Sequence, residues 1–313
     1  MNPVLRAVVR VSGLLLLVGL SHVAAAESLT VNGQKRTYNT VNLRPGQAAP
    51  LVVVLHGNRQ QGEDVEARSR WPELAAREGF GLVFPDGLNK AWADLRDDAE
   101  RAGQGPPQGT DDRGFLLALV DFLIQRGVAD PRRIYLAGVS NGGAMALSLA
   151  CTNPERFAGV ASVIMSMTQG MVERCPAWGR PVPVLFMNGT ADPLVPYGGG
   201  RGTARIAVSG VIPTPMAVEF WRTRNGCRLG DARLSHQPDR DGADGSTVSL
   251  IESNCPPGAE VSLFRINGGG HRVPSFDRDA RFSRLVDTVL GPQNHDVDGP
   301  EEIWRFFARQ PTR

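Results

Sequence analysis

The main part of this chain lacks the features that mark several classes of protein. Apart from the N-terminus, no apolar run approaches the length that a helix needs to cross a bilayer. No CxxC pair and no nearby pair of histidines supports a metal site, and we expect neither a metal nor a cofactor. No repeat and no low-complexity linker divides the chain. We therefore expect a single domain over residues 27–313.

A strong net charge is also missing. The chain has 34 basic and 32 acidic residues, and Arg6 and Arg10 belong to the N-terminal segment described next. Without those two arginines, basic and acidic residues are equal in number. This balance favours neither nucleic acid nor an anionic membrane surface as a partner. The oligomeric state cannot be inferred from it.

The N-terminal segment has the pattern of a secretory signal peptide. Two arginines precede the apolar run 14–20, and Ala24, Ala25 and Ala26 form an A-x-A cleavage site. We expect cleavage after residue 26 and release of a protein without membrane attachment, either outside the cell or in the periplasm. An uncleaved anchor is the alternative. No cysteine stands at the junction, so nothing suggests a lipid anchor.

Cysteine is scarce, with four residues, and all four lie in the exported part. An even number in an oxidising compartment predicts two disulfides, for which three pairings are possible. We prefer Cys151–Cys175 and Cys227–Cys255, because each pair closes a local segment.

Strands and helices alternate along the chain, which predicts an α/β protein with a mostly parallel, doubly wound sheet and helices on both faces. Three short antiparallel strands are expected first, at residues 29–31, 36–38 and 41–43, around Asn32-Gly33. Residues 89–112 and 228–245 are interpreted as loops. The other predicted strands are 50–55, 81–84, 134–137, 159–164, 182–187, 248–251 and 261–266, and the predicted helices are 71–78, 115–126, 143–150, 215–224 and 301–308.

The most informative motif is Gly138-Val139-Ser140-Asn141-Gly142, directly after an apolar strand and before a run of small residues. A G-x-S-x-G sequence between a strand and a helix is the nucleophile elbow of α/β-hydrolases, in which the serine hydroxyl is exposed above the sheet. An ordinary glycine-rich turn is the alternative. The motif predicts acyl transfer through Ser140.

A serine hydroxyl needs an imidazole to accept its proton, and in α/β-hydrolases the base follows the serine and the acid along the chain. His271 comes directly after a predicted strand and three glycines, whereas His236 lies in a polar loop and His295 is interpreted as a solvated cap residue near a helix start. We therefore predict His271 as the base. His56 precedes the serine and is expected to brace its own loop.

The acid should follow a strand between Ser140 and His271. Asp192 comes just after the apolar run 182–187, and its carboxylate would orient the imidazole. A turn-capping role is the alternative for Asp192. The other candidates lie in loops without a preceding buried strand and are Asp231, Asp239, Asp241 and Asp244.

An oxyanion hole requires two backbone N–H groups directed at the developing negative charge. In this fold one comes from the residue after the nucleophile, here Asn141, and the other from the loop after an early strand. Leu55-His56-Gly57-Asn58 ends the first buried strand, so we predict the N–H of Asn58 as the second donor.

Several segments together resemble the secreted polyhydroxybutyrate depolymerase and feruloyl esterase family of α/β-hydrolases. They span residues 50 to 308 in the family's order. The resemblance implies Ser140, Asp192 and His271 as the triad and supports the two local disulfides. The segments are Leu55-His56-Gly57, Phe84-Pro85-Asp86-Gly87, Asp111-Asp112, Gly114-Phe115-Leu116, Gly138–Gly143, Asn188–Pro193, Val195-Pro196-Tyr197, Asn225-Gly226-Cys227, Gly268–His271 and Glu301–Phe307.

The chain departs from the family pattern at two places near the site. Arg272-Val273-Pro274 follows the histidine where the family usually has Trp-Pro, and Asn58 stands where depolymerases often have cysteine. The identity of the substrate therefore cannot be inferred from the family resemblance. Trp92, Tyr197 and Arg272 are our candidate substrate-binding residues, with packing or plain exposure as the alternative for each.

These observations predict a secreted serine carboxylic-ester hydrolase. The expected substrates are hydroxycinnamate (feruloyl) esters of plant cell-wall polysaccharide or hydroxyalkanoate oligomers of the polyhydroxybutyrate type. No polymer-binding module follows residue 308, which favours soluble esters over crystalline polymer. The alternatives are an acyltransferase or peptidase on the same fold, or a hydrolase fold that binds a ligand without catalysis.

Overall fold

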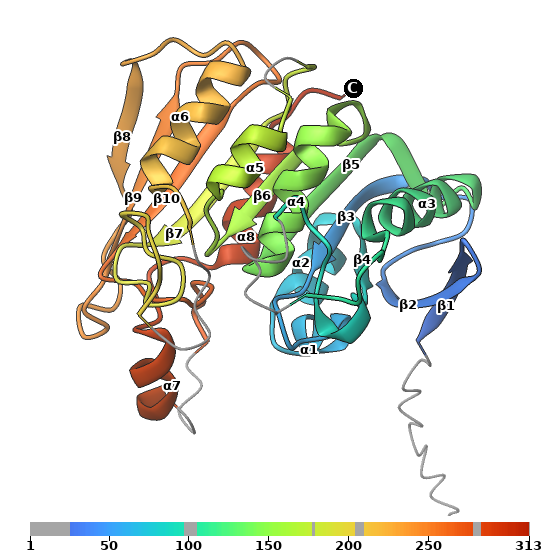
Figure 1. Ribbon diagram of the computed structural model, residues 1–313, viewed down its shortest axis with the longest axis horizontal. Helices are drawn as coiled ribbons and strands as arrows, with labels where there is room; N and C mark the ends of the chain where they lie inside the picture. Colours follow the sequence, from blue (N-terminus) through green and yellow to red (C-terminus); the bar gives the residue numbers. More distant parts are fainter. Residues whose placement is uncertain (1–25, 97–104, 177–178, 204–209, 278–282, 313) are drawn as a thin grey trace, which may run out of the picture.

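A large, mostly parallel sheet forms the centre of the molecule in the computed structural model (Figure 1), which describes residues 26–96, 105–176, 179–203, 210–277 and 283–312. The predicted signal peptide, except residue 26, lies outside the described residues. The strands are β1 Glu27–Val31, β2 Gln34–Val41, β3 Ala49–Leu55, β4 Gly81–Pro85, β5 Ala129–Val139, β6 Gly159–Val163, β7 Val184–Gly189, β8 Ala232–His236, β9 Thr247–Ser253 and β10 Val261–Asn267. The helices are α1 Gly62–Ala67, α2 Trp71–Glu78, η1 Leu88–Lys90, α3 Asp112–Gln125, α4 Asn141–Thr152, η2 Pro154–Arg156, α5 Gln169–Arg174, α6 Thr214–Arg224, α7 Ser283–Leu290 and α8 Gly299–Ala308.

The strand order identifies the α/β-hydrolase fold. The sheet runs β1-β2-β4-β3-β5-β6-β7-β10-β9-β8, and its central strands from β4 to β10 pair in parallel. Antiparallel strands close both edges, β2 and β1 on one side and β9 and β8 on the other. Every residue of β4, β6 and β7 is buried, as expected for strands covered on both faces.

Two apolar layers hold helices against the two faces of the sheet. One layer joins the sheet to α3, α4, α5 and α6, with Phe115, Leu147 and Trp221 among its buried side chains. The other layer joins it to α2 and α8 through Trp71 and Trp304. Figure 1 shows α4 along the middle of the sheet, where it contacts β3, β5 and β6. The helices therefore lie on both faces, as predicted.

Some elements differ from the predictions. Residues 232–236, which we expected in a loop, form the edge strand β8, whose residues are mostly exposed. The short helices α1 and α5 and the helix α7 were not predicted. Two strands take the place of the three short strands expected at the start, because β2 continues without a break to Val41. The predicted hairpin turn is present, with Asn32 and Gly33 at φ of 51° and 77°. Asp111 caps α3 by accepting a hydrogen bond from the Gly114 N–H.

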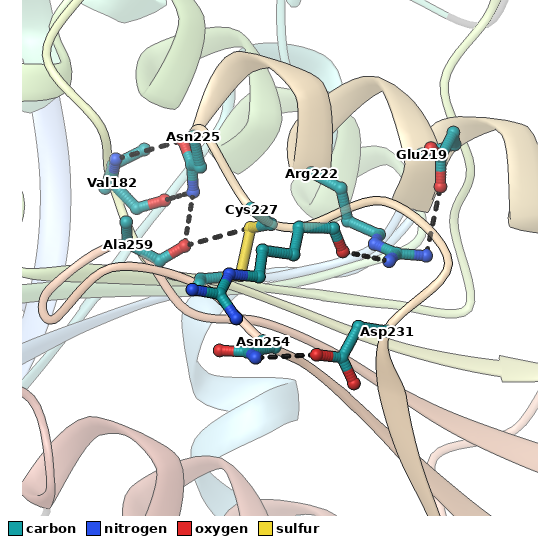
Figure 2. The surroundings of a disulfide bond; sticks show 10 residues. Val182, Glu219, Arg222, Asn225, Cys227, Asp231, Asn254 and Ala259 are labelled. Carbon is teal, nitrogen blue, oxygen red and sulfur yellow. Dashed lines mark hydrogen bonds and ion pairs between the residues drawn. A yellow bond between two sulfur atoms is a disulfide. The ribbon is translucent and has the colours of Figure 1, made fainter.

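Two disulfides stabilise local segments of the fold. Cys151 at the end of α4 is joined to Cys175, and Cys227 after α6 is joined to Cys255 after β9. Figure 2 shows the second disulfide beside Asn225, whose side-chain amide donates hydrogen bonds to the carbonyls of Val182 and Ala259. The end of α6 is thereby fastened to the starts of β7 and β10. Among the described helices, none combines the length and apolar character needed to span a membrane.

Candidate active site

The elbow after β5 exposes the Ser140 hydroxyl by a sharp turn. Ser140 has φ of 53° and ψ of −117°, a region that residues other than glycine rarely adopt. A Cβ atom on Gly138 would lie 2.0 Å from the Gly142 carbonyl oxygen, and one on Gly142 would lie 2.4 Å from the Leu55 carbonyl oxygen. Side chains at either glycine would therefore push strand and helix apart. The glycines of the G-x-S-x-G motif are required by this close approach.

Three side chains from different strand ends form a hydrogen-bonded line. Ser140 follows β5, Asp192 follows β7 and His271 follows β10, and the carboxyl ends of these parallel strands lie at one edge of the sheet. The Ser140 Oγ lies 3.0 Å from Nε2 of His271, and Nδ1 of His271 lies 2.7 Å from Oδ2 of Asp192. Oδ1 of Asp192 accepts the backbone N–H groups of Leu194 and Val195 at 2.8 Å each. The structure thus brings together the three residues predicted as a triad.

The other histidines contact different groups. His236 ends β8 rather than lying in a loop, is exposed, and meets the Ser249 hydroxyl. His295 is half-buried rather than solvated, and its ring hydrogen-bonds the carbonyl of Ser275. The cap of α8 is Asp298 instead. Neither ring contacts Ser140.

His56 braces the loop after β3, as expected. Its Nε2 accepts the Gly87 N–H at 2.9 Å, so the ring proton is on Nδ1 and is donated to the Gly57 carbonyl at 2.7 Å. Burial lowers the pKa of His56, because an imidazolium would lose its hydration there. The neutral ring therefore keeps one tautomer and holds the backbone next to Asn58 in place.

The two predicted oxyanion donors lie on facing segments. Asn58 and Gly57 line the same pocket as Ser140 and Asn141, and a Cβ atom on Gly57 would lie 3.7 Å from that of Ser140. The Gly57 N–H is bound by the Gln60 side chain at 3.0 Å, which tightens the turn. The loop after β3 therefore runs directly beside the nucleophile elbow, where a second backbone donor is needed.

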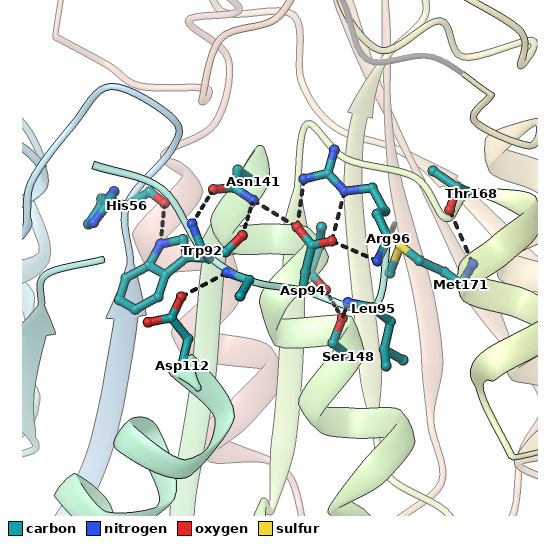
Figure 3. Close-up of polar contacts among 12 residues, drawn as sticks. His56, Trp92, Asp94, Leu95, Arg96, Asp112, Asn141, Ser148, Thr168 and Met171 are labelled. Carbon is teal, nitrogen blue, oxygen red and sulfur yellow. Dashed lines mark hydrogen bonds and ion pairs between the residues drawn. The ribbon is translucent and has the colours of Figure 1, made fainter. Parts of the chain in front are cut away.

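The side chain of Asn141 anchors the first turn of α4 to the segment after η1 (Figure 3). Its Oδ1 accepts the Trp92 N–H at 2.7 Å, and its Nδ2 donates to the Trp92 carbonyl and to Oδ2 of Asp94. Asp94 in turn forms a two-bond ion pair with Arg96, at 2.9 and 2.6 Å. All four residues are buried. The network fixes the position of the Asn141 backbone amide.

A pocket of about 500 Å³ lies beside this line of residues. One wall of the pocket comes from the loop after β3 and from the α1–α2 connection. The other wall comes from the residues after His271 and from the start of α8. Ser140, Ile164 and Arg59 line the pocket and have φ of 53°, 49° and 66°. Strained backbone of this kind is concentrated at functional sites. The apolar lining residues are Val65, Trp71, Val139, Ile164, Leu194, Val273, Pro274, Leu290 and Pro300.

Only one of the three candidate substrate-binding residues lines the pocket among the described residues. Arg272 does, and its guanidinium also pairs with Asp287 at 2.5 Å. Trp92 is fully buried, and its indole N–H donates to the His56 carbonyl. Trp92 therefore supports the loop after β3 instead. Tyr197 is half-buried against the apolar layer of α4 and α6, and burial raises its pKa. Trp92 and Tyr197 therefore fit the alternative of packing.

Known proteins with similar sequences show the family. Residues 38–172 match the family model "Esterase PHB depolymerase". The protein named "Putative esterase NocK" from Nocardia uniformis subsp. tsuyamanensis is 32% identical over 80% of this chain and 74% of its own length. This chain belongs to the polyhydroxybutyrate depolymerase and feruloyl esterase family. The protein is a carboxylic ester hydrolase, and we refer to it below as the esterase.

A further relative and a solved structure are also similar to the esterase. Feruloyl esterase B from Piromyces equi is 30% identical over 72% of the esterase, which spans 40% of the length of that longer protein. The solved structure of an acetyl xylan esterase from Aspergillus awamori superposes with a TM-score of 0.55 at 14% identity, over 79% of the esterase and 94% of that chain. The superposition supports the shared fold.

Asp94 and Arg96 were missed by the sequence analysis. Both lie in the segment 89–112, which is polar and was interpreted as a surface loop. No local pattern separates them from the other acidic and basic residues there, because their importance comes from Asn141, 47 positions away from Asp94. Only the fold brings these side chains together.

The anchoring network leads to a prediction for Asn141. We expect Asn141→Ala to lower kcat about tenfold with little change in KM, because the backbone N–H of residue 141 remains but loses its support. The buried Trp92 N–H would also lose its acceptor, which costs about 1–3 kcal/mol of stability. Steady-state kinetics and thermal unfolding measure the two effects.

Asn225→Ala is the matched control for this variant. Asn225 is also buried and also binds backbone groups, those of Val182 and Ala259, but it lies at the opposite end of the sheet. We expect a similar loss of stability and an unchanged kcat. Equal kcat values in the two variants would show that the Asn141 side chain has no positioning role.

Proposed function

We propose that the esterase uses a serine mechanism with Ser140, His271 and Asp192 as its catalytic triad. The Ser140 Oγ attacks the ester carbonyl while Nε2 of His271 takes the hydroxyl proton. The carbonyl oxygen becomes an oxyanion that the backbone N–H groups of Asn58 and Asn141 stabilise. His271 then gives the proton to the departing alcohol, and an acyl group remains on Ser140.

Water completes the reaction by the same steps. His271 takes a proton from the water as the water oxygen bonds to the acyl carbon, and the ester bond between that carbon and Ser140 Oγ then breaks. The proton returns to the Ser140 oxygen, and the carboxylic acid leaves. Asp192 keeps the Nδ1 proton of His271 in place throughout and stabilises the imidazolium when it forms.

One observation carries this proposal: the line from Ser140 Oγ through His271 to Asp192, with contacts of 3.0 and 2.7 Å, beside the pocket. A serine bound to the base and a base bound to an acid is the arrangement that activates a hydroxyl nucleophile. The side chain of Asp192 is almost fully buried, so its carboxylate meets the imidazole with little competition from water.

For substrate we propose hydroxycinnamate esters on cell-wall sugars or hydroxyalkanoate oligomers. The names of the family model and of the relative from Piromyces equi support these two classes. The apolar wall that includes Val65, Trp71 and Val273 would accept an aromatic or alkyl acyl group, and a volume of about 500 Å³ fits a small ester.

We further propose that residues 1–26 are a signal peptide and that residues 27–313 are one exported catalytic domain. The two disulfides support an oxidising compartment, because such bonds persist in exported proteins and are rare in the cytosol. The signal pattern of residues 6–26 supports the same location.

The proposed mechanism predicts a trapped intermediate on Ser140. With p-nitrophenyl butyrate in stopped flow, we expect a burst of one p-nitrophenolate per chain when deacylation is the slower step. An aryl phosphonate should inactivate the enzyme and add its mass to the peptide that contains Ser140. Methyl ferulate and a hydroxybutyrate oligomer, used as competitors, show which acyl group protects the serine. A phosphonate found on another residue would contradict the mechanism.

A further inference from the structure

The pocket beside Ser140 is positively charged, although the chain without its N-terminal segment has equal numbers of basic and acidic residues. We propose that it selects esters that carry a carboxylate away from the scissile bond, and that Arg59, Arg68 and Arg70 bind this carboxylate. The inference rests on the proposed function and adds a substrate requirement to it. Among the described residues, the charged side chains that line the pocket are those of Arg59, Arg68, Arg70, Arg96, Arg272, Asp64 and Asp298.

Two of these arginines are neutralised by close carboxylates. Arg96 makes its two-bond pair with Asp94, and both side chains are buried. Arg272 pairs with Asp287 at 2.5 Å. Short and partly buried pairs of this kind leave little charge for a ligand, so these two arginines contribute mainly to the shape of the pocket.

The other three arginines have weak or no counter-charges. Arg68 lies 3.5 Å from Asp64 with its own side chain 75% exposed, and Arg70 lies 3.4 Å from Glu73, whose side chain is 74% exposed. Among the described residues Arg59 makes no ion pair. Exposed pairs contribute little free energy because water and salt screen them. Their guanidinium groups can therefore exchange such partners for an anionic ligand.

The acidic lining residues do not cancel this charge. Oδ2 of Asp64 accepts the Gln61 N–H at the start of α1, and only its Oδ1 lies near Arg68, at 3.5 Å. Asp298 is buried and caps α8 through the Glu301 N–H, and burial raises the pKa of its carboxyl group. Five arginines line the pocket against these two aspartates, so basic residues remain in excess.

The backbone places Arg59 next to the proposed site of chemistry. Arg59 directly follows Asn58 and has φ of 66°, which disfavours any side chain with a Cβ atom. Its N–H donates to the Lys90 carbonyl at 2.8 Å, a bond that holds this conformation. Arg68 and Arg70 come from the α1–α2 connection on the same wall. The three arginines therefore line the pocket from the loop after β3 and from the α1–α2 connection.

A carboxylate is the anion that this arrangement suits best in an ester substrate. Guanidinium binds carboxylate through two parallel hydrogen bonds, and a positive pocket with apolar walls concentrates anions near the reacting serine. Two sources place a carboxylate on the alcohol side of the ester. One is the free end of a hydroxy-acid oligomer, and the other is a uronic acid that carries a hydroxycinnamoyl group.

The test compares charged and neutral members of two substrate pairs. The first pair is the linear dimer of 3-hydroxybutyrate with a free carboxylate and the same dimer with a terminal primary amide. The second pair is feruloyl glucuronate and feruloyl glucose. In one pair we expect kcat/KM to be about tenfold higher for the charged member at low ionic strength, as for a hydrogen bond to a charged group. The preference should shrink at about 0.3 M NaCl, because salt screens the attraction.

Arginine variants assign the preference to named residues. We expect Arg59→Gln and Arg68→Gln each to reduce the ratio of charged to neutral kcat/KM at least about threefold, and the triple variant that also carries Arg70→Gln to remove the preference. Arg44→Gln is the matched control, because Arg44 is exposed in the turn before β3, at the opposite edge of the sheet, and should leave every rate unchanged. Thermal unfolding of each variant confirms that it is folded.

Two results would overturn the inference: equal rates for both members of both pairs, or a preference that survives in the folded triple variant. Neutral p-nitrophenyl acetate tests the proposed function separately. An enzyme that hydrolyses this ester and shows no preference for a carboxylate contradicts the substrate selection alone.

Discussion

Replacing Ser140 with alanine is expected to lower kcat for a simple ester by about 10⁵- to 10⁶-fold, the loss that follows removal of a triad nucleophile. The variant should still bind substrate, because the pocket walls and the proposed oxyanion donors are unchanged. Initial rates with p-nitrophenyl butyrate, and the absence of a burst, measure the effect. Residual hydrolysis would come from substrate binding and the oxyanion donors.

The structure predicts that this variant keeps its stability. The Ser140 side chain makes no capping hydrogen bond to α4, and alanine has the same Cβ atom in the same strained backbone. We expect the free energy of unfolding to change by less than about 0.5 kcal/mol. Ser28→Ala, on the exposed face of β1, is the control for the substitution itself. A folded Ser140→Ala enzyme with near-normal activity would rule out the serine mechanism.

The positions of Ser140, Asp192 and His271 could be predicted because of a property of parallel sheets. Buried parallel strands appear in the sequence as continuous apolar runs, and their carboxyl ends lie at one edge. A polar residue shortly after such a run is therefore placed in three dimensions without knowledge of any contact. The same reasoning applies to Asn58, which follows β3 and lines the pocket.

Features that depend on contacts between loops could not be predicted in this way. Trp92 and Asp94 lie in a polar segment, and their burial comes from Asn141 and His56 across the fold. The edge strand β8 has mostly exposed residues and so lacks the apolar alternation that marks a strand. Its pairing with β9 is visible only once the neighbouring strand is in place.

Replacing Asp192 with asparagine is expected to lower kcat about 10⁴-fold while KM stays similar. Oδ1 of Asp192 accepts two backbone N–H groups, those of Leu194 and Val195, so the oxygen of an asparagine would take that position. Its NH₂ group would then face Nδ1 of His271. The imidazole would have to carry its proton on Nε2, and it could no longer accept the proton of Ser140.

Asp111→Asn is the matched control, because asparagine caps a helix as well as aspartate does and α3 lies outside the site. It should leave both kcat and the unfolding temperature unchanged. The asparagine at 192 keeps the two backbone hydrogen bonds, so circular dichroism should show a folded protein at the assay temperature. If the folded Asp192→Asn variant retained more than about a tenth of the wild-type kcat, Asp192 would be a turn-capping residue and not the orienting acid.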